Sequence, residues 1–114
     1  MGTKKLRRPA EGGRMKKKFA FLLMGKDFDM SKDIAVFETE GMISYLFTVT
    51  SFEAALKRAV ACAEDGFGAI ELCGAFGKEW ADKIIAATGN RIAVGYVVHN
   101  PEQDALFERF FTGA

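Results

Sequence analysis

The stretch GAIELCGAFGKEWADKIIAATGNRIAVGYVV, residues 68–98, decides the fold class of this protein. It opens with a short apolar run, residues 68–74, that predicts a buried strand. A helical pattern follows over residues 78–88, and Gly89 is placed to end it. A second apolar run, residues 92–98, predicts another strand. Strand, helix and strand in succession predict two parallel strands joined by a right-handed helical crossover.

The same alternation continues on both sides of this stretch. KFAFLLM (18–24) and ISYLFTV (43–49) each predict a strand, and Gly25 stops the first. Thr50 and Glu53 show the capping-box spacing at the start of a helix that Gly66 ends. The stretch HNPEQDALFERFF (99–111) predicts a last helix, with Asn100 as its cap and an apolar stripe of Leu106, Phe107, Phe110 and Phe111.

The pattern therefore predicts a single small α/β domain over residues 15–114. Its sheet is expected to be mainly parallel and four-stranded, with β-α-β-α-β-α order after an N-terminal strand. Residues 25–42 fit either a short helix capped by Ser31 or an extended stretch through AVFETE toward a turn at Gly41, and the extended alternative is favoured. Residues 1–14 are polar and rich in Lys, Arg and Gly, which predicts a disordered extension.

Composition narrows the classes of protein. Hydrophobic residues make up 49% of the 114 residues, enough for a packed core, and the formal net charge of +1 gives no general bias toward nucleic acid. No segment approaches the ~20 apolar residues of a membrane span. FAFLLM is short for a secretory signal and lacks a cleavage site. We expect a cytoplasmic protein in which Cys62 and Cys73 are free thiols.

Candidate site residues collect where the predicted strands end. The carboxyl ends of parallel strands share one edge, and ligands of open α/β sheets bind there. Cys73 and His99 are catalytic candidates at this edge, and Glu71, inside the strand that ends at Cys73, is a third. The candidate ligand-binding residues are Gly25, Gly74, Ala75, Phe76, Gly77 and Asn100.

Each catalytic candidate has more than one interpretation. Cys73 and His99 form a nucleophile and base if they meet, but a core cysteine and a histidine that fills space or bonds to backbone are the favoured interpretations of each residue taken singly. Glu71 lies on the strand face opposite Ile70 and Leu72. If that face is covered, Glu71 pairs with a basic residue, faces a subunit interface or acts as an acid or base.

The sequence contains no motif for metal binding or nucleotide binding. One histidine and two distant cysteines do not make a zinc site, and neither G-x-G-x-x-G nor the P-loop motif follows a strand. We therefore expect no metal and no cofactor. The amides of residues 75–78, at a helix start, predict an anionic group on any ligand.

Three motifs, FETEGM, IELCGAFG and VGYVVHNPEQDALFERFF, resemble a family of small prokaryotic proteins of unknown function. The resemblance covers roughly residues 17–111. It implies a single α/β domain of about this size, and it carries no activity that transfers to this chain.

Two classes of function stay open. The first is a small-molecule binder or enzyme that uses the carboxyl edge of the sheet. The second is a structural or regulatory module that meets itself or a protein partner. The 11 phenylalanines exceed what a core of this size needs, so we expect a homo-oligomer in which the LFERFF stripe covers its own sheet or a neighbour's.

Overall fold

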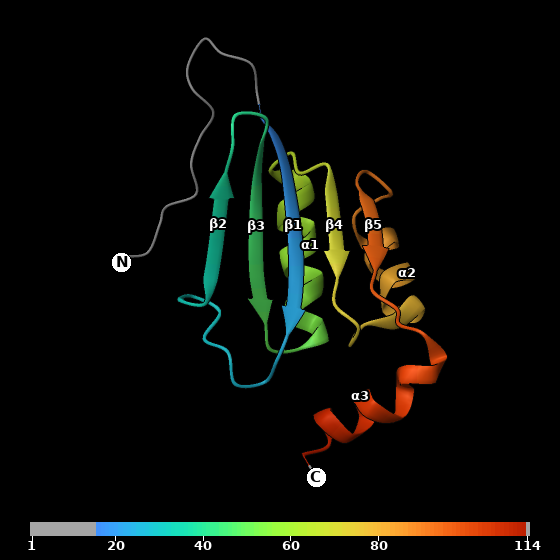
Figure 1. Cartoon of the computed structure of the whole chain (residues 1–114). Coiled ribbons are helices and arrows are strands. Elements are labelled where there is room, and N and C mark those ends of the chain that lie inside the picture. Colours follow the sequence, from blue (N-terminus) through green and yellow to red (C-terminus); the bar gives the residue numbers. More distant parts are fainter. Residues whose placement is uncertain (1–15, 114) are drawn as a thin grey trace.

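The computed structural model describes residues 16–113, and within that range it has five strands and three α-helices (Figure 1). A single 3-10 turn, η1 (Pro101–Gln103), precedes the last helix. The extension predicted for residues 1–14 lies outside the described residues. In chain order the elements are β1 (Lys17–Met24), β2 (Ile34–Glu38), β3 (Met42–Val49), α1 (Phe52–Glu64), β4 (Ala69–Leu72), α2 (Gly77–Ala87), β5 (Ala93–Tyr96) and α3 (Asp104–Phe111).

The strands form one sheet in the order β2-β3-β1-β4-β5. β1, β3, β4 and β5 are parallel, which confirms the mainly parallel sheet, whereas β2 pairs antiparallel with β3. The expectation of four strands is wrong, because the ambiguous segment 25–42 supplies β2 as a fifth strand at the edge. The amide of Thr39 donates to the carbonyl of Met42 at 2.9 Å and closes the turn that returns the chain to β3.

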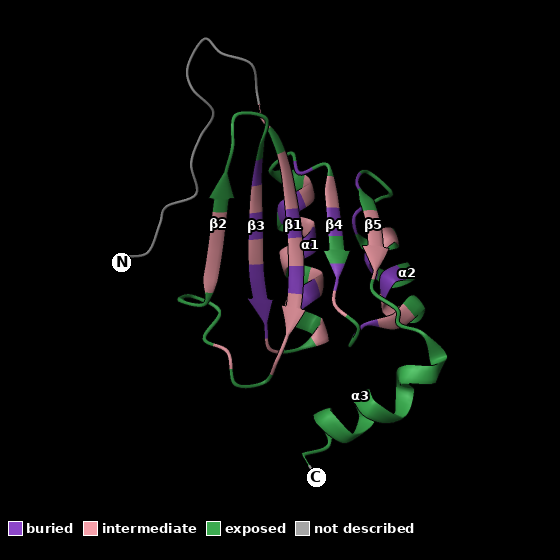
Figure 2. Ribbon diagram, in the orientation of Figure 1, coloured by how far each residue is buried: buried purple, intermediate pink, exposed green. Residues whose placement is uncertain are grey.

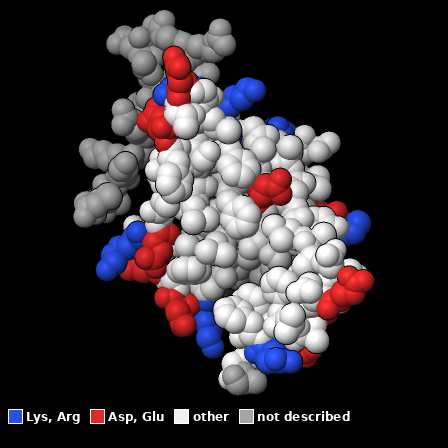
Figure 3. Space-filling model, in the orientation of Figure 1, with Lys and Arg blue, Asp and Glu red and all other residues white. Residues whose placement is uncertain are grey.

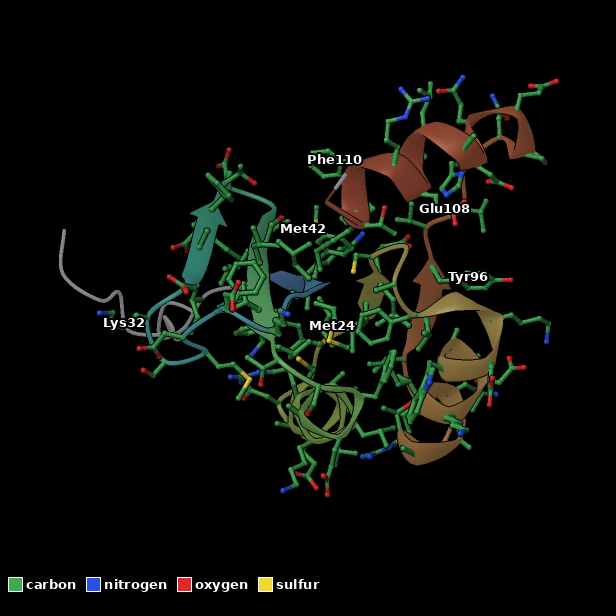
Figure 4. All side chains as sticks on the ribbon, turned by 90° about the horizontal axis from the view of Figure 1, so that it is seen from below. Met24, Lys32, Met42, Tyr96, Glu108 and Phe110 are labelled. Carbon is green, nitrogen blue, oxygen red and sulfur yellow. The ribbon has the colours of Figure 1, made fainter. Side chains whose placement is uncertain are left out.

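Both crossover helices, α1 and α2, lie on the same face of the sheet, and the view along the strands shows them together on one side (Figure 4). The crossovers β3-α1-β4 and β4-α2-β5 run in one direction across the sheet. Right-handed crossovers that run in one direction place their helices on one face. The connection that runs the other way, from β1 to β3, contains β2 instead of a helix.

The hydrophobic core fills the space between the sheet and these two helices. Its aromatic members stack closely: the ring centroids of Tyr45 and Phe47 are 5.4 Å apart, and those of Phe52 and Trp80 are 4.5 Å apart. The largest fully buried side chains are Phe47, Leu22, Ile43, Ile70, Leu72, Ile84, Val49 and Thr88. Figure 2 shows the buried residues concentrated in the central strands and on the inner sides of α1 and α2.

The structure agrees with the predicted ends of the helices but differs at two predicted caps. Gly66 and Gly89 adopt positive φ angles of 83° and 67° after α1 and α2, as expected. The cap of α1 is Ser51 and not Thr50, since the Ser51 hydroxyl accepts the amide of Ala54 at 3.0 Å. Asn100 makes no side-chain capping bond, and α3 begins after η1.

Candidate functional site

Cys73 joins the carboxyl ends of β1 and β4. Its amide donates to the carbonyl of Leu22 at 3.1 Å, so the pairing continues one residue beyond β4. Its Sγ accepts the amide of Met24 at 3.3 Å, and the side chain is half-buried against the core. The thiol therefore satisfies a backbone donor at the end of β1.

The predicted ligand-binding residues in the turn after Cys73 differ in exposure. Phe76 is buried and packs edge-to-face on Phe52, with ring centroids 5.5 Å apart. Gly77 opens α2 with a φ of 69°, where glycine is favoured. Gly74 and Ala75 are exposed, and a Cβ on Gly74 would come no closer than 3.9 Å to its neighbours. The edge is thus open at these two residues, while Phe76 belongs to the core.

Gly25 has a structural partner at the end of β1. A Cβ placed on Gly25 would lie 2.6 Å from Cε2 of Phe28, so the ring of Phe28 occupies the space beside it. The missing side chain at Gly25 serves this packing.

His99 is engaged by the C-terminal helix. Its ring stacks on that of Phe107 with centroids 4.0 Å apart and an angle of 15°. Its Nδ1 lies 3.1 Å from Oδ1 of Asp104 and 3.4 Å from the carbonyl of Asn100. Through these contacts His99 sets the direction in which α3 leaves the sheet.

The geometry gives Cys73 and His99 separate environments. Within residues 16–113, no hydrogen bond joins the two side chains. The thiol of Cys73 faces Met24, and the ring of His99 faces Asp104 and Phe107. A nucleophile and base pair would need a rearrangement of the segment that carries His99.

Glu71 lies on the face of β4 opposite Ile70 and Leu72. It is exposed, because the face of the sheet to which it points carries no covering helix in the described chain. Glu71 pairs in register with Phe21 on one side and Gly95 on the other. A Cβ on Gly95 would lie 2.5 Å from Oε1 of Glu71, so the carboxylate rests over the glycine. Glu71 forms no ion pair with another described residue.

The uncovered face around Glu71 is apolar, and we call it the open face. Along β1, β3 and β2 its members alternate with residues that pack into the core, and Val97 follows directly after β5. Phe37 is the most exposed of them, at 65%. Figure 3 shows this face as mostly white, with acidic atoms interrupting the white area over β4. The apolar members are Phe19, Phe21, Leu23, Phe37, Met42, Leu46 and Val97.

Sequence reasoning missed the open face, although a signal was present. FAFLL in β1 is apolar at successive positions, which places large side chains on both faces of the strand. Such a strand is normally taken as buried on both faces. Only the count of phenylalanines suggested a surplus of apolar surface.

Two hollows in the surface lie beside α1, away from the predicted site residues. One of about 230 Å³ is lined by Met30, Val49, Ala54, Lys57 and Arg58. Another of about 320 Å³ runs along the outside of α1, beside Leu56, Val60 and Glu64. Neither is lined by a residue that the sequence predicted for the site.

The described residues also bear on metal binding and membrane insertion. Among residues 16–113, no group of three or more His, Cys, Asp or Glu side chains is placed to hold a metal ion. Over the same range, no helix combines the length and apolar character needed to cross a bilayer.

Comparison with known proteins assigns the family. The model of a family of unknown function, DUF6506, matches residues 17–112. The chain belongs to this family, which confirms the resemblance to a family of unknown function. No curated protein and no solved structure matches the chain.

Proposed function

We propose that this protein acts as a binding module whose open face accepts the apolar side of a helix. The observation that carries the proposal is a five-stranded sheet covered by helices on one face only, with aromatic and aliphatic side chains on the other. Apolar side chains that gather on one uncovered face of a sheet favour an interaction site there.

A helix suits this surface better than an added strand. The open face presents side chains and no unpaired backbone groups, because the N–H and C=O groups of β1, β3 and β4 are used within the sheet. An amphipathic helix has its own backbone bonds satisfied and brings only an apolar stripe. Covering the face would contribute about 25 cal/mol for each Å² of apolar area removed from water.

The carboxylate of Glu71 adds specificity to this surface. It is the one acidic residue of β4 and lies among Phe21, Leu46 and the bare backbone of Gly95. A partner that buries it without compensation pays a large desolvation penalty. The preferred partner helix therefore carries a basic residue beside its apolar stripe.

NMR on the ¹⁵N-labelled full chain tests the proposal. The variant Phe110→Glu/Phe111→Glu is used so that the chain's own α3 does not compete for the face. The probe is a synthetic amphipathic helical peptide with Leu and Phe at i, i+3, i+4 and i+7 and one Arg beside them. We expect saturable shifts centred on the amides of Phe21, Leu46 and Glu71.

A matched control distinguishes binding at the open face from non-specific binding of the peptide. Adding Phe37→Glu to the same variant should abolish the shifts, whereas adding Lys57→Glu on α1 should not. Shifts that cluster around the hollows of α1, or no saturable binding, would reject the open face as a binding surface.

The carboxyl edge supports a second candidate, binding of a small anionic molecule. At this edge β1 leaves toward β3 and β4 leaves toward β5, which is the kind of switch point where ligands of open sheets bind. Gly74 and Ala75 are exposed there, beside the amides that start α2. Thermal-shift measurements with inorganic phosphate and with citrate would test it. Stabilisation that is lost in Cys73→Ala/His99→Ala supports this site, and equal stabilisation of both chains removes it.

A further inference from the structure

The C-terminal helix α3 leaves its apolar stripe uncovered. Every residue of α3 is exposed, and Phe110 and Phe111 are each 75% exposed. Figure 2 shows α3 as exposed along its whole length. Together with Leu106 and Phe107, these two residues form a continuous apolar side of the helix. A helix of this kind needs a surface to cover it.

The connection to β5 holds α3 off its own sheet. The ring of His99 stacks on Phe107, and Nδ1 of His99 lies 3.1 Å from Asp104. Seen along the strands, α3 lies on the side of the sheet opposite α1 and α2 (Figure 4), and Figure 1 shows it beyond the carboxyl ends of β4 and β5. The white area of the open face continues downward onto α3 in Figure 3. The chain thus presents an apolar helix and an apolar sheet face on the same side, without joining them.

From this arrangement we propose that a second copy of the chain covers the open face, in a two-fold dimer where α3 of each copy lies on the partner's sheet. The inference rests on the proposed function of the open face as a docking surface for a helix, and it names the occupant. A two-fold axis uses both unmatched surfaces of each copy at once and leaves neither uncovered.

The area available matches that of a stable dimer. A buried aromatic side chain removes about 150–250 Å² from water. The exposed parts of the four apolar residues of α3 therefore supply roughly 400–500 Å². With a similar area from the sheet, and two such contacts in a symmetric dimer, about 1,800 Å² is buried. Specific, stable interfaces bury about 1,200–2,000 Å².

The charges of Glu71 and Arg109 also favour a second copy of the chain on the open face. Glu71 stands in the open face without an ion pair in the described chain. Arg109, also without one, borders the apolar stripe of α3 on the Leu106 side, and Glu108 borders it on the Phe111 side. When α3 lies on a partner's sheet, the long side chain of Arg109 has the reach to meet Glu71 of the other copy. Arg109 would thus be the basic residue that we expect on a helix bound to the open face.

Charge reversal with sedimentation velocity tests the proposal on the full chain. We expect a concentration-dependent dimer in the wild type. Glu71→Arg and Arg109→Glu should each weaken the dimer by about tenfold or more in Kd, because like charges then meet. Glu64→Arg, the same charge change on the outer side of α1, should leave Kd unchanged.

Mixing the two single variants gives the decisive measurement. In a mixed dimer of Glu71→Arg and Arg109→Glu chains both contacts again join opposite charges, so mixing should restore the dimer that neither variant forms alone. A wild type that stays monomeric into the micromolar range, or reversals that do not respond to mixing, overturns the proposal. A monomer whose α3 amides are protected from hydrogen exchange also overturns it, because α3 would then cover its own sheet.

These outcomes separate the inference from the function on which it rests. If the peptide binds the open face and the chain does not dimerise through α3, the binding module stands and the second copy is excluded. If the peptide does not bind and a dimer forms that is insensitive to both Phe37→Glu and Glu71→Arg, the open face is excluded as well.

Discussion

At the residue scale, the most informative pair is Glu71 with Gly95. The glycine leaves a bare patch of backbone on β5, and the carboxylate of Glu71 lies over it. The carboxylate can stay at the centre of an apolar face because this position gives it room and access to water. A glycine in a strand often marks such a close approach.

Adding a methyl group at Gly95 should move the carboxylate and leave the fold intact. In Gly95→Ala the new Cβ would lie 2.5 Å from Oε1 of Glu71, which is the mobile end of a flexible side chain. We expect the free energy of unfolding in urea to change by less than about 1 kcal/mol. In Glu71→Ala/Gly95→Ala the cost should vanish or become a gain, which a double-mutant cycle measures. A loss above about 3 kcal/mol would mean that backbone, not the carboxylate, fills this space.

A second residue, Cys62 on α1, links stability to pH. It is 2% exposed, and burial raises the pKa of its thiol from an ordinary value near 9.0 to about 11. Below pH 9 the thiol is protonated in both states, and stability does not depend on it. Above that pH the unfolded chain releases the proton first, so stability falls by about 2–3 kcal/mol as pH rises through 11.

Chemical denaturation between pH 8 and pH 11 would show this loss. The wild type should lose more stability over that range than Cys62→Ala, whose dependence on pH should be flatter. Parallel curves for the two proteins would assign the pH dependence to other groups, such as Tyr45, whose pKa is also raised by burial.

At the scale of elements, α1 shows how a single side chain sets a boundary. Its inner side consists of Ala55, Ala59 and Cys62, small residues that let the helix approach the sheet closely. Its first turn is satisfied by the hydroxyl of Ser51, in an extended conformation at φ −157°. The adjacent Thr50 is directed elsewhere, with its hydroxyl 3.8 Å from the sulfur of Met30.

Alanine substitution at the two hydroxyls should give unequal results. Ser51→Ala removes the acceptor for the amide of Ala54 and should cost about 1 kcal/mol of unfolding free energy, within the usual 0.5–2 kcal/mol for a cap. Thr50→Ala should cost clearly less. Equal costs, or a larger cost at Thr50, would mean that the helix begins one residue earlier in solution.

At the scale of the whole molecule, the protein is a two-layer domain with an unmatched third layer. The core between the sheet and α1 and α2 holds the fold, whereas α3 contributes to it only through the turn at His99. Stability of the isolated chain and stability of an assembly should therefore depend on different phenylalanines.

Alanine at a core phenylalanine should lower stability at every protein concentration, whereas alanine at an α3 phenylalanine should remove the dependence of stability on concentration. Phe47→Ala should cost about 3–5 kcal/mol at every protein concentration, because Phe47 is 1% exposed. Phe110→Ala should change the melting temperature of the dilute chain very little and should remove its rise with concentration. A melting temperature of the wild type that is independent of concentration would speak against assembly through α3.

Much of this molecule was accessible from local patterns. Apolar runs and glycines placed β1, β3, β4 and β5, since periodicity and turn chemistry act over a few residues. The β-α-β-α-β-α order predicted parallel strands, because crossover handedness follows from the chirality of the chain. The same patterns brought Cys73 and Gly74 to the carboxyl edge of the sheet.

Long-range packing decided the rest. The pairing of β2 with β3 put a strand, and not a helix, in the connection from β1 to β3, and Glu71 is exposed beside Phe21 on the uncovered face. The ring of His99 stacks on Phe107 of α3, whereas the thiol of Cys73 accepts the amide of Met24 at the end of β1. These outcomes depend on which distant segments meet, and a helical or strand period is the same whether its apolar side meets the same chain, a second copy or water.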